Sequence, residues 1–122
     1  MYIEIDFNSD EALYMQLRNQ IILGIATAQL KDGESLPSVR NLAETIGINM
    51  HTVNKAYAIL KQDGFVRVDR RRGVVVSVDV DKLNTVNVLK GYLRPIAAAA
   101  MAKGITKAEA AQVMAEVYDE LM

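Results

Sequence analysis

Residues 36–57 read LPSVRNLAETIGINMHTVNKAY, and the fold prediction for the whole chain starts from this segment. Apolar residues recur at helical spacing on each side of Gly47, first through residues 39–46 and then through residues 53–60. Two short helices that meet at a sharp turn and each bury one apolar face form a helix-turn-helix. In that motif the first turns of the second helix stay exposed and fit the major groove of DNA. The stretch therefore predicts sequence-specific DNA binding.

Capping residues predict where these two helices begin and end. Pro37 disfavours a helical residue before it, so Ser38 is expected to cap the first helix. Asn49 is expected to cap the second by accepting a hydrogen bond from a backbone N–H two or three residues later. That helix should end near Asp63, with Gly64 as a left-handed stop. Its first two turns are where groove-inserted helices place base-reading side chains.

A β-hairpin is predicted next along the chain. Two runs rich in β-branched residues, 65–68 and 74–78, flank the segment Asp69-Arg70-Arg71-Arg72-Gly73. A basic hairpin tip beside a groove-reading helix can reach phosphates or the adjacent minor groove, with an affinity that falls steeply with salt. The hairpin is therefore predicted to be the wing of a winged helix-turn-helix.

The N-terminal region predicts a short strand and then a helix. Ile3, Ile5 and Phe7 alternate with polar residues, which is the period of a half-buried strand. Ser9 is expected to cap a helix that runs to about Leu30. Its apolar positions cover more than one stripe, which predicts packing on the core and on a second surface, such as a partner subunit.

The C-terminal region predicts two amphipathic helices in a hairpin. The first begins near Asp81 and contains Pro95, so it is either kinked there or split into two pieces. Gly104 should end it, and the capping box that Thr106 forms with Glu109 should start the last helix. Apolar stripes on short helices with little else to cover them predict a homodimer interface. The residues predicted for it are Leu89, Leu93, Ile96, Ala97, Ala100, Met101, Val113, Met114, Val117 and Leu121.

Bulk properties set the broad class of the protein. The 122 residues are 51% hydrophobic and include no cysteine. These values predict a globular protein with a real core, without disulfides or thiolate metal sites. No apolar run approaches the roughly 20 residues that span a bilayer, and the first residues lack the features of a secretory signal. We therefore expect a cytoplasmic protein without a membrane partner.

The distribution of charge is more informative than the net charge of −1. Residues 31–72 hold eight Lys and Arg residues against five Asp and Glu residues, whereas both flanks are slightly acidic. The positive excess therefore coincides with the predicted DNA-reading unit.

These residues resemble the GntR family of bacterial transcription regulators over about residues 9–78. The matching motifs are Leu13-Tyr14-x-Gln16-Leu17, Leu36-Pro37-Ser38-x-Arg40-x-Leu42-Ala43, Thr52-Val53-x-Lys55-Ala56-Tyr57-x-x-Leu60 and Gly64-Phe65-Val66. The start of the chain, the block around residues 48–57 and the two-helix tail are similar to the YtrA subfamily. This resemblance implies a dimeric repressor of a small operon, often one that encodes a membrane transporter.

The chain departs from the family pattern at several positions. Ala12 and Asp32 replace prolines, which the fold should tolerate. Met50 and His51 stand where family members commonly have an arginine or proline followed by threonine or asparagine, so this chain should read a different operator. The wing lacks the usual glycine-rich turn, which makes phosphate contact its expected role.

We predict that one set of residues forms the DNA-contacting surface. They are Ser38, Arg40, Asn49, Met50, His51, Thr52, Asn54, Lys55, Arg70, Arg71, Arg72 and Gly73. Each has a structural alternative. Arg40 could pair with Glu44 at i, i+4, Thr52 could serve only in helix capping, and the arginine run could be a solvated surface.

The sequence thus predicts a mainly α protein with a small β-wing. Residues 1–78 form the winged helix-turn-helix domain and residues 79–122 the dimerisation hairpin. The predicted function is a transcriptional regulator that binds a palindromic operator in double-stranded DNA as a homodimer. The alternative is a winged-helix module that binds protein. No catalytic, metal-binding or cofactor motif is present, so we do not expect an enzyme. A small-molecule effector near Met101 is a further hypothesis.

Overall fold

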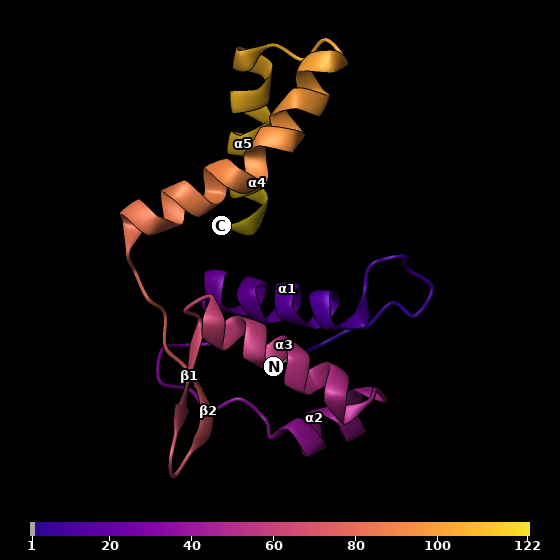
Figure 1. Ribbon diagram of the computed structural model, residues 1–122, viewed down its shortest axis with the longest axis vertical. Coiled ribbons are helices and arrows are strands. Elements are labelled where there is room, and N and C mark those ends of the chain that lie inside the picture. The colour runs from indigo at the N-terminus through magenta and orange to yellow at the C-terminus, as the bar shows by residue number, and fades with distance from the viewer. Residues whose placement is uncertain (1) are drawn as a thin grey trace. The chain divides into compact units, whose positions relative to one another are not determined.

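The computed structural model describes residues 2–122, which form five helices and one two-stranded antiparallel sheet (Figure 1). The fold is mainly α with a small β-wing, as predicted. The chain divides into two compact units, Met1–Asp79 and Val80–Met122. The helices and strands in order are α1 (Leu13–Ala26), α2 (Val39–Ile46), α3 (Met50–Gln62), β1 (Val66–Asp69), β2 (Gly73–Val76), α4 (Lys82–Ala102) and α5 (Lys107–Leu121).

The first unit is built around α3, which packs against both α1 and α2. Its inward face is fully covered, because the side chains of Val53, Ala56, Tyr57 and Leu60 are all buried. Leu17 and Ile21 of α1 lie in the same cluster, with no exposed surface. Burying these apolar faces is the main source of the free energy that holds the three helices together.

Tyr57 also ties α3 to the segment before α2. Its hydroxyl donates a hydrogen bond of 2.7 Å to the carbonyl oxygen of Pro37. Burial raises the pKa of the Tyr57 phenol above its ordinary value, so this group stays protonated and remains a donor. The contact fixes the chain immediately before the cap of α2.

The expected N-terminal strand does not form, and that prediction is wrong. Residues 2–6 form no regular secondary structure, and the backbones of Glu4 and Asp6 bond to glutamine side chains of α1 instead of to another strand. The amide of Gln16 accepts from the backbone N–H of Asp6 over 2.9 Å and donates to its carbonyl oxygen over 3.0 Å. Gln20 makes the corresponding pair of bonds with the backbone of Glu4. Ile3 and Ile5 do pack against the core, whereas Phe7 is exposed.

Helix α1 is shorter than predicted at both ends. Ser9 does not cap it, because the Ser9 hydroxyl accepts from the backbone N–H of Glu11 in a local turn and the helix begins four residues later. At the other end Ala28 adopts a left-handed φ of 62°. The backbone N–H of Leu30 then bonds to the carbonyl of Gly24, which closes the helix end and buries the Leu30 side chain.

The wing has the predicted hairpin topology. Strands β1 and β2 pair antiparallel, with Val66 opposite Val76 and Asp69 opposite Gly73. The segment before α2 also bonds to β2. The N–H of Gly33 donates to the carbonyl of Val76, and the N–H of Leu36 donates to that of Val74. This third extended segment anchors the wing to the body of the unit.

The second unit is the predicted helical hairpin. Helix α4 is continuous through Pro95 and changes direction in its middle, so the kinked form is the one observed (Figure 1). Pro95 cannot donate to the carbonyl of Gly91 one turn earlier, which explains the bend. The capping box is present, because Thr106 and Glu109 bond to each other's backbone N–H. The Glu109 carboxyl accepts from the backbone N–H of Thr106, and this bond lowers the pKa of that carboxyl.

Candidate nucleic-acid interface

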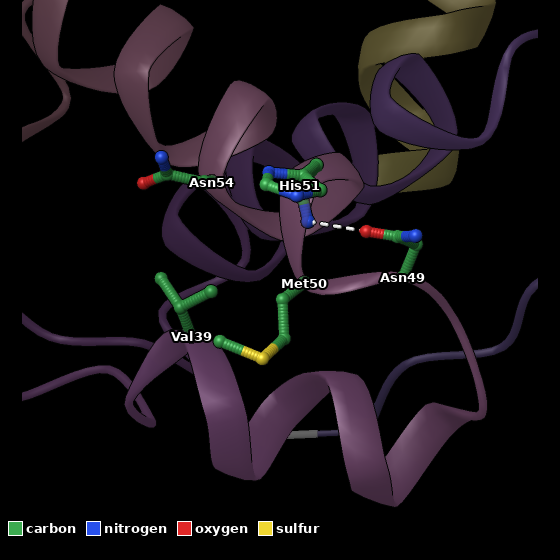
Figure 2. A pocket seen from close by; sticks show the side chains of 5 residues that line it. All are labelled: Val39, Asn49, Met50, His51 and Asn54. Carbon is green, nitrogen blue, oxygen red and sulfur yellow. Dashed lines mark hydrogen bonds between the residues drawn. The ribbon is translucent and has the colours of Figure 1, made fainter.

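The turn between α2 and α3 has the geometry that the sequence predicted. Gly47 adopts a left-handed φ of 74° and ends α2, and its N–H donates to the carbonyl of Ala43 over 2.9 Å. Asn49 caps α3 by accepting from the backbone N–H of His51 over 2.7 Å (Figure 2). Ser38 caps α2 by accepting from the N–H of Asn41 over 3.1 Å. All three local predictions are confirmed.

The first two turns of α3 present their predicted DNA-contacting residues outward. His51, Asn54 and Lys55 are exposed, and Met50 is 46% exposed despite being a large apolar side chain. Thr52 is only half-buried, although it lies beside the fully buried Val53. The α3 helix therefore has one face in the core and one free face that carries polar and apolar groups.

Arg40 lies on the exposed side of α2 and does not pair with Glu44. Within residues 2–122 the salt bridges are Arg18 with Asp63 and Arg67 with Asp69. The Ser38 hydroxyl, exposed beside Arg40, accepts one bond in the cap and keeps its own proton available to donate. These two side chains leave donors directed to solvent at the start of α2.

Lys55 has a partner that sequence reasoning missed. Its Nζ lies 4.0 Å from the centre of the Tyr14 ring, a cation–π contact between α3 and α1. The two residues are far apart in the sequence, and no local pattern indicates that they meet. Because Lys55 is still exposed, its ammonium is oriented by the ring without being withdrawn from solvent.

The wing tip is organised by Asp69. Its Oδ1 accepts from the backbone N–H groups of Arg71 and Arg72 over 2.8 and 3.0 Å. Gly73, with a left-handed φ of 76°, allows the chain to return into β2. The guanidinium of Arg72 donates to the carbonyl of Gly33 in the body of the unit. The hairpin tip is thus a defined loop, with Arg70 and Arg71 exposed.

The loop should respond to pH through Asp69. The backbone bonds from Arg71 and then Arg72, together with the nearby Arg67, lower the pKa of this carboxyl. A lowered folded-state pKa means that the carboxylate stabilises the loop above its ordinary pKa, and that this contribution is lost as the pH falls through the folded value. We expect the amide proton resonances of Arg71 and Arg72 to titrate together below the ordinary range of an aspartate.

Nuclear magnetic resonance of the full chain would measure this titration. Asp69→Asn keeps an oxygen acceptor but cannot ionise, so in that variant the two amide resonances should stay constant over the same pH interval. A midpoint at or above the ordinary aspartate value in the wild type would contradict the role given to Asp69.

In a single chain, every predicted dimerisation residue is exposed or half-buried. No residue of α4 or α5 is buried. Ile96 is 63% exposed, Met101 74% and Val113 54%, whereas Leu93 and Ala100 are half-buried. The remaining members, Leu89, Ala97, Met114, Val117 and Leu121, are exposed.

Residues 2–122 contain no group of three or more His, Cys, Asp or Glu side chains placed to hold a metal ion. No helix within the same residues is both long and apolar enough to cross a bilayer.

An exposed helix that follows a glycine turn in the chain and precedes a two-stranded hairpin is typical of winged helix-turn-helix proteins. These features place the chain in that class. The family described as "Bacterial regulatory proteins, gntR family" matches residues 10–76, more than half of the chain. The chain therefore belongs to the GntR family of transcriptional regulators.

Individual relatives agree with this assignment. An HTH-type transcriptional regulator of Mycobacterium tuberculosis is 31% identical over 120 residues, covering 98% of this chain and 96% of the relative. The HTH-type transcriptional repressor YtrA of Bacillus subtilis is 39% identical over 75 residues, covering 62% of this chain and 58% of YtrA. The solved structure of YtrA from Sulfolobus acidocaldarius, a GntR-family transcription factor, is 42% identical. It covers 75% of this chain and 96% of that one, with a TM-score of 0.62. The predicted resemblance to YtrA-like regulators is confirmed, and the family and these relatives are regulators, not enzymes.

Proposed function

We propose that this chain represses transcription by binding a palindromic operator as a homodimer. In this proposal residues 1–78 bind double-stranded DNA and residues 79–122 hold the two protomers together. The observation that carries it is the two-faced α3 helix, whose inward side is buried while Met50, His51, Asn54 and Lys55 are exposed. A helix anchored in this way can enter a major groove without disturbing its own domain.

Phosphate contacts would come from both sides of α3. Ser38 and Arg40 supply donors at the start of α2, and Arg70 and Arg71 supply them at the wing tip. Contacts of this kind position a protein on DNA, while base edges are read by the groove-inserted helix. Arg72 would contribute charge from a guanidinium that already donates to the carbonyl of Gly33.

The apolar surface of the second unit supports the homodimer. Two helices with no buried residue leave large side chains such as Ile96 and Val113 in water, which is unfavourable until another apolar surface covers them. A two-fold dimer places two equivalent α3 helices on two half-sites, about 10 base pairs or a multiple of one helical turn apart. A palindromic operator follows from that symmetry.

The direction of regulation is inferred from similarity. The Bacillus subtilis relative is named a transcriptional repressor. From the resemblance to the YtrA subfamily we also propose control of a small operon, such as one for a membrane transporter. We also propose a small-molecule effector near Met101, because the exposed methionine and the alanine-rich part of α4 offer an adaptable apolar surface. A thermal-shift screen of metabolites that finds no stabilising compound would argue against this effector.

A protein-binding winged-helix module is the second candidate, favoured by the net charge of −1. An electrophoretic shift on fragments of the chain's own promoter separates the two functions. The repressor should retard a fragment in a salt-sensitive manner, whereas a protein-binding module should not.

Replacing Arg40 tests the proposed contact surface. Arg40→Ala should weaken operator binding by at least about tenfold, or roughly 1.4 kcal/mol, because it removes an unpaired guanidinium from the phosphate-facing side of α2. Fluorescence anisotropy with labelled duplex would measure the loss. Lys61→Ala is the matched control, because it removes the same charge from the far end of α3 and should change affinity little. Equal effects of the two substitutions would mean that the contact surface is misplaced.

A further inference from the structure

A hollow of about 570 Å³ lies between the start of α2 and the start of α3. It is lined by Val39, Asn49, Met50, His51 and Asn54. Figure 2 shows the Met50 side chain reaching from α3 toward Val39 on α2, so that apolar groups from two helices line the same hollow. The hollow therefore has an apolar wall in the middle of the surface proposed to face DNA.

The two asparagine side chains that line the hollow differ in their hydrogen bonding. The Oδ1 of Asn49 accepts from the backbone N–H of His51 and is committed to the helix cap. Asn54 lies one helical turn after Met50, on the same side of α3. Its side-chain amide makes no hydrogen bond within residues 2–122. An apolar side chain and a free amide are thus next to each other on the exposed helix.

DNA offers few groups that match an apolar wall. The edges of the bases in the major groove present mainly hydrogen-bond donors and acceptors, and the largest apolar group among them is the C5 methyl group of thymine. A charged or strongly polar side chain at residue 50 would gain nothing from that methyl group. Methionine is flexible and polarisable, so the Met50 side chain can adapt to such a methyl group, and Val39 adds a second apolar side chain to the lining of the hollow.

We infer that Met50 and Val39 form an apolar seat for the 5-methyl group of one thymine in each operator half-site. This inference rests on the proposed DNA-binding function and deepens it, because it specifies one base and the atom by which that base is recognised. Asn54 contacts the adjoining base pair and contributes affinity that does not depend on the methyl group.

The test uses the 122-residue chain and DNA duplexes that this chain selects from a random pool. Duplexes enriched from a random pool are resynthesised with each thymine replaced, one at a time, by deoxyuridine, which lacks only the methyl group. One thymine in each half-site should be sensitive, with binding weakened about fourfold, as expected when the favourable burial of one methyl-sized apolar group is lost. Met50→Ala should bind the two duplexes nearly equally.

Asn54→Ala is the matched variant on the same helix face. It should bind more weakly than wild type but keep the fourfold preference for thymine over deoxyuridine. Thermal melting controls for folding, and because Met50 and Asn54 are exposed, neither substitution should lower the melting temperature appreciably.

The outcomes separate this inference from the proposed function. Failure of the wild-type chain to enrich any duplex would overturn both. Enrichment of a defined operator in which no thymine responds to loss of its methyl group would overturn the seat alone. A full methyl preference that persists in Met50→Ala would also overturn it, because another group would then be reading the methyl.

Discussion

The double substitution Ile96→Asp/Val113→Asp is expected to abolish dimerisation and to weaken operator binding by at least about thirtyfold, or roughly 2 kcal/mol. Both side chains are more than half exposed in a single chain, so the substitutions should not disturb the fold of one protomer. In the proposed dimer they would place carboxylates in an apolar interface, where an unpaired charge is strongly unfavourable. Each protomer would then meet one half-site alone.

The size of the loss follows from the number of contacts. Specific DNA binding exceeds non-specific binding by about 4 kcal/mol or more, so a monomer that makes half of the specific contacts should lose at least about 2 kcal/mol. Light scattering gives the oligomeric state and anisotropy gives the affinity. The matched control, Ala98→Asp/Gln112→Asp, adds the same two charges on the sides of α4 and α5 away from the apolar stripes. A dimer that survives Ile96→Asp/Val113→Asp would refute the assigned interface.

Gln16→Ala should lower the free energy of unfolding by about 2 kcal/mol, because it removes hydrogen bonds that each contribute about 0.5 to 1.5 kcal/mol. The Gln16 side chain is 7% exposed. It bonds to both backbone groups of Asp6 and donates to the carbonyl of Glu11 over 3.0 Å. Without it, the backbone of the N-terminal segment loses its partners and Ile3 and Ile5 lose their fixed position over the core.

Two further variants separate hydrogen bonding from packing at this site. Gln16→Leu fills the space but makes no hydrogen bond, so it should be about as destabilising as Gln16→Ala. Asn19→Ala removes an exposed amide from the same helix and should change stability little. Urea unfolding at one fixed protomer concentration gives the comparison, and the exchange rate of the Asp6 amide gives a local readout. Full stability in Gln16→Leu would show that shape alone matters.

The sequence predicted the parts of this fold that depend on neighbouring residues. Ser38, Asn49 and Thr106 each cap the helix that follows them through bonds two or three residues long, and Gly47 and Gly64 take the left-handed conformations that end helices. Local chemistry decides such features, so they can be read from the chain. The hairpin was predicted for the same reason, since its β-branched runs and its turn are adjacent.

Features that depend on distant partners were not predicted. The alternation of Ile3, Ile5 and Phe7 indicated a strand, but the backbone of that segment bonds to glutamine side chains of α1. The contact between Lys55 and Tyr14 likewise joins positions whose proximity only the folded chain reveals. For the candidate site, sequence motifs predicted the residues and the helix that carries them. The finding that Val39 of α2 and Met50 of α3 line the same hollow required the structure.

The most direct test of the central claim is selection of DNA by the full chain from a random duplex pool, followed by sequencing. Binding as a homodimer through two α3 helices predicts enrichment of an inverted repeat with half-sites centred about 10 base pairs, or a multiple of one helical turn, apart. It also predicts that Ile96→Asp/Val113→Asp fails to enrich that repeat. A pool that stays random, or a selected site without two-fold symmetry, would contradict a homodimer that reads DNA through two α3 helices.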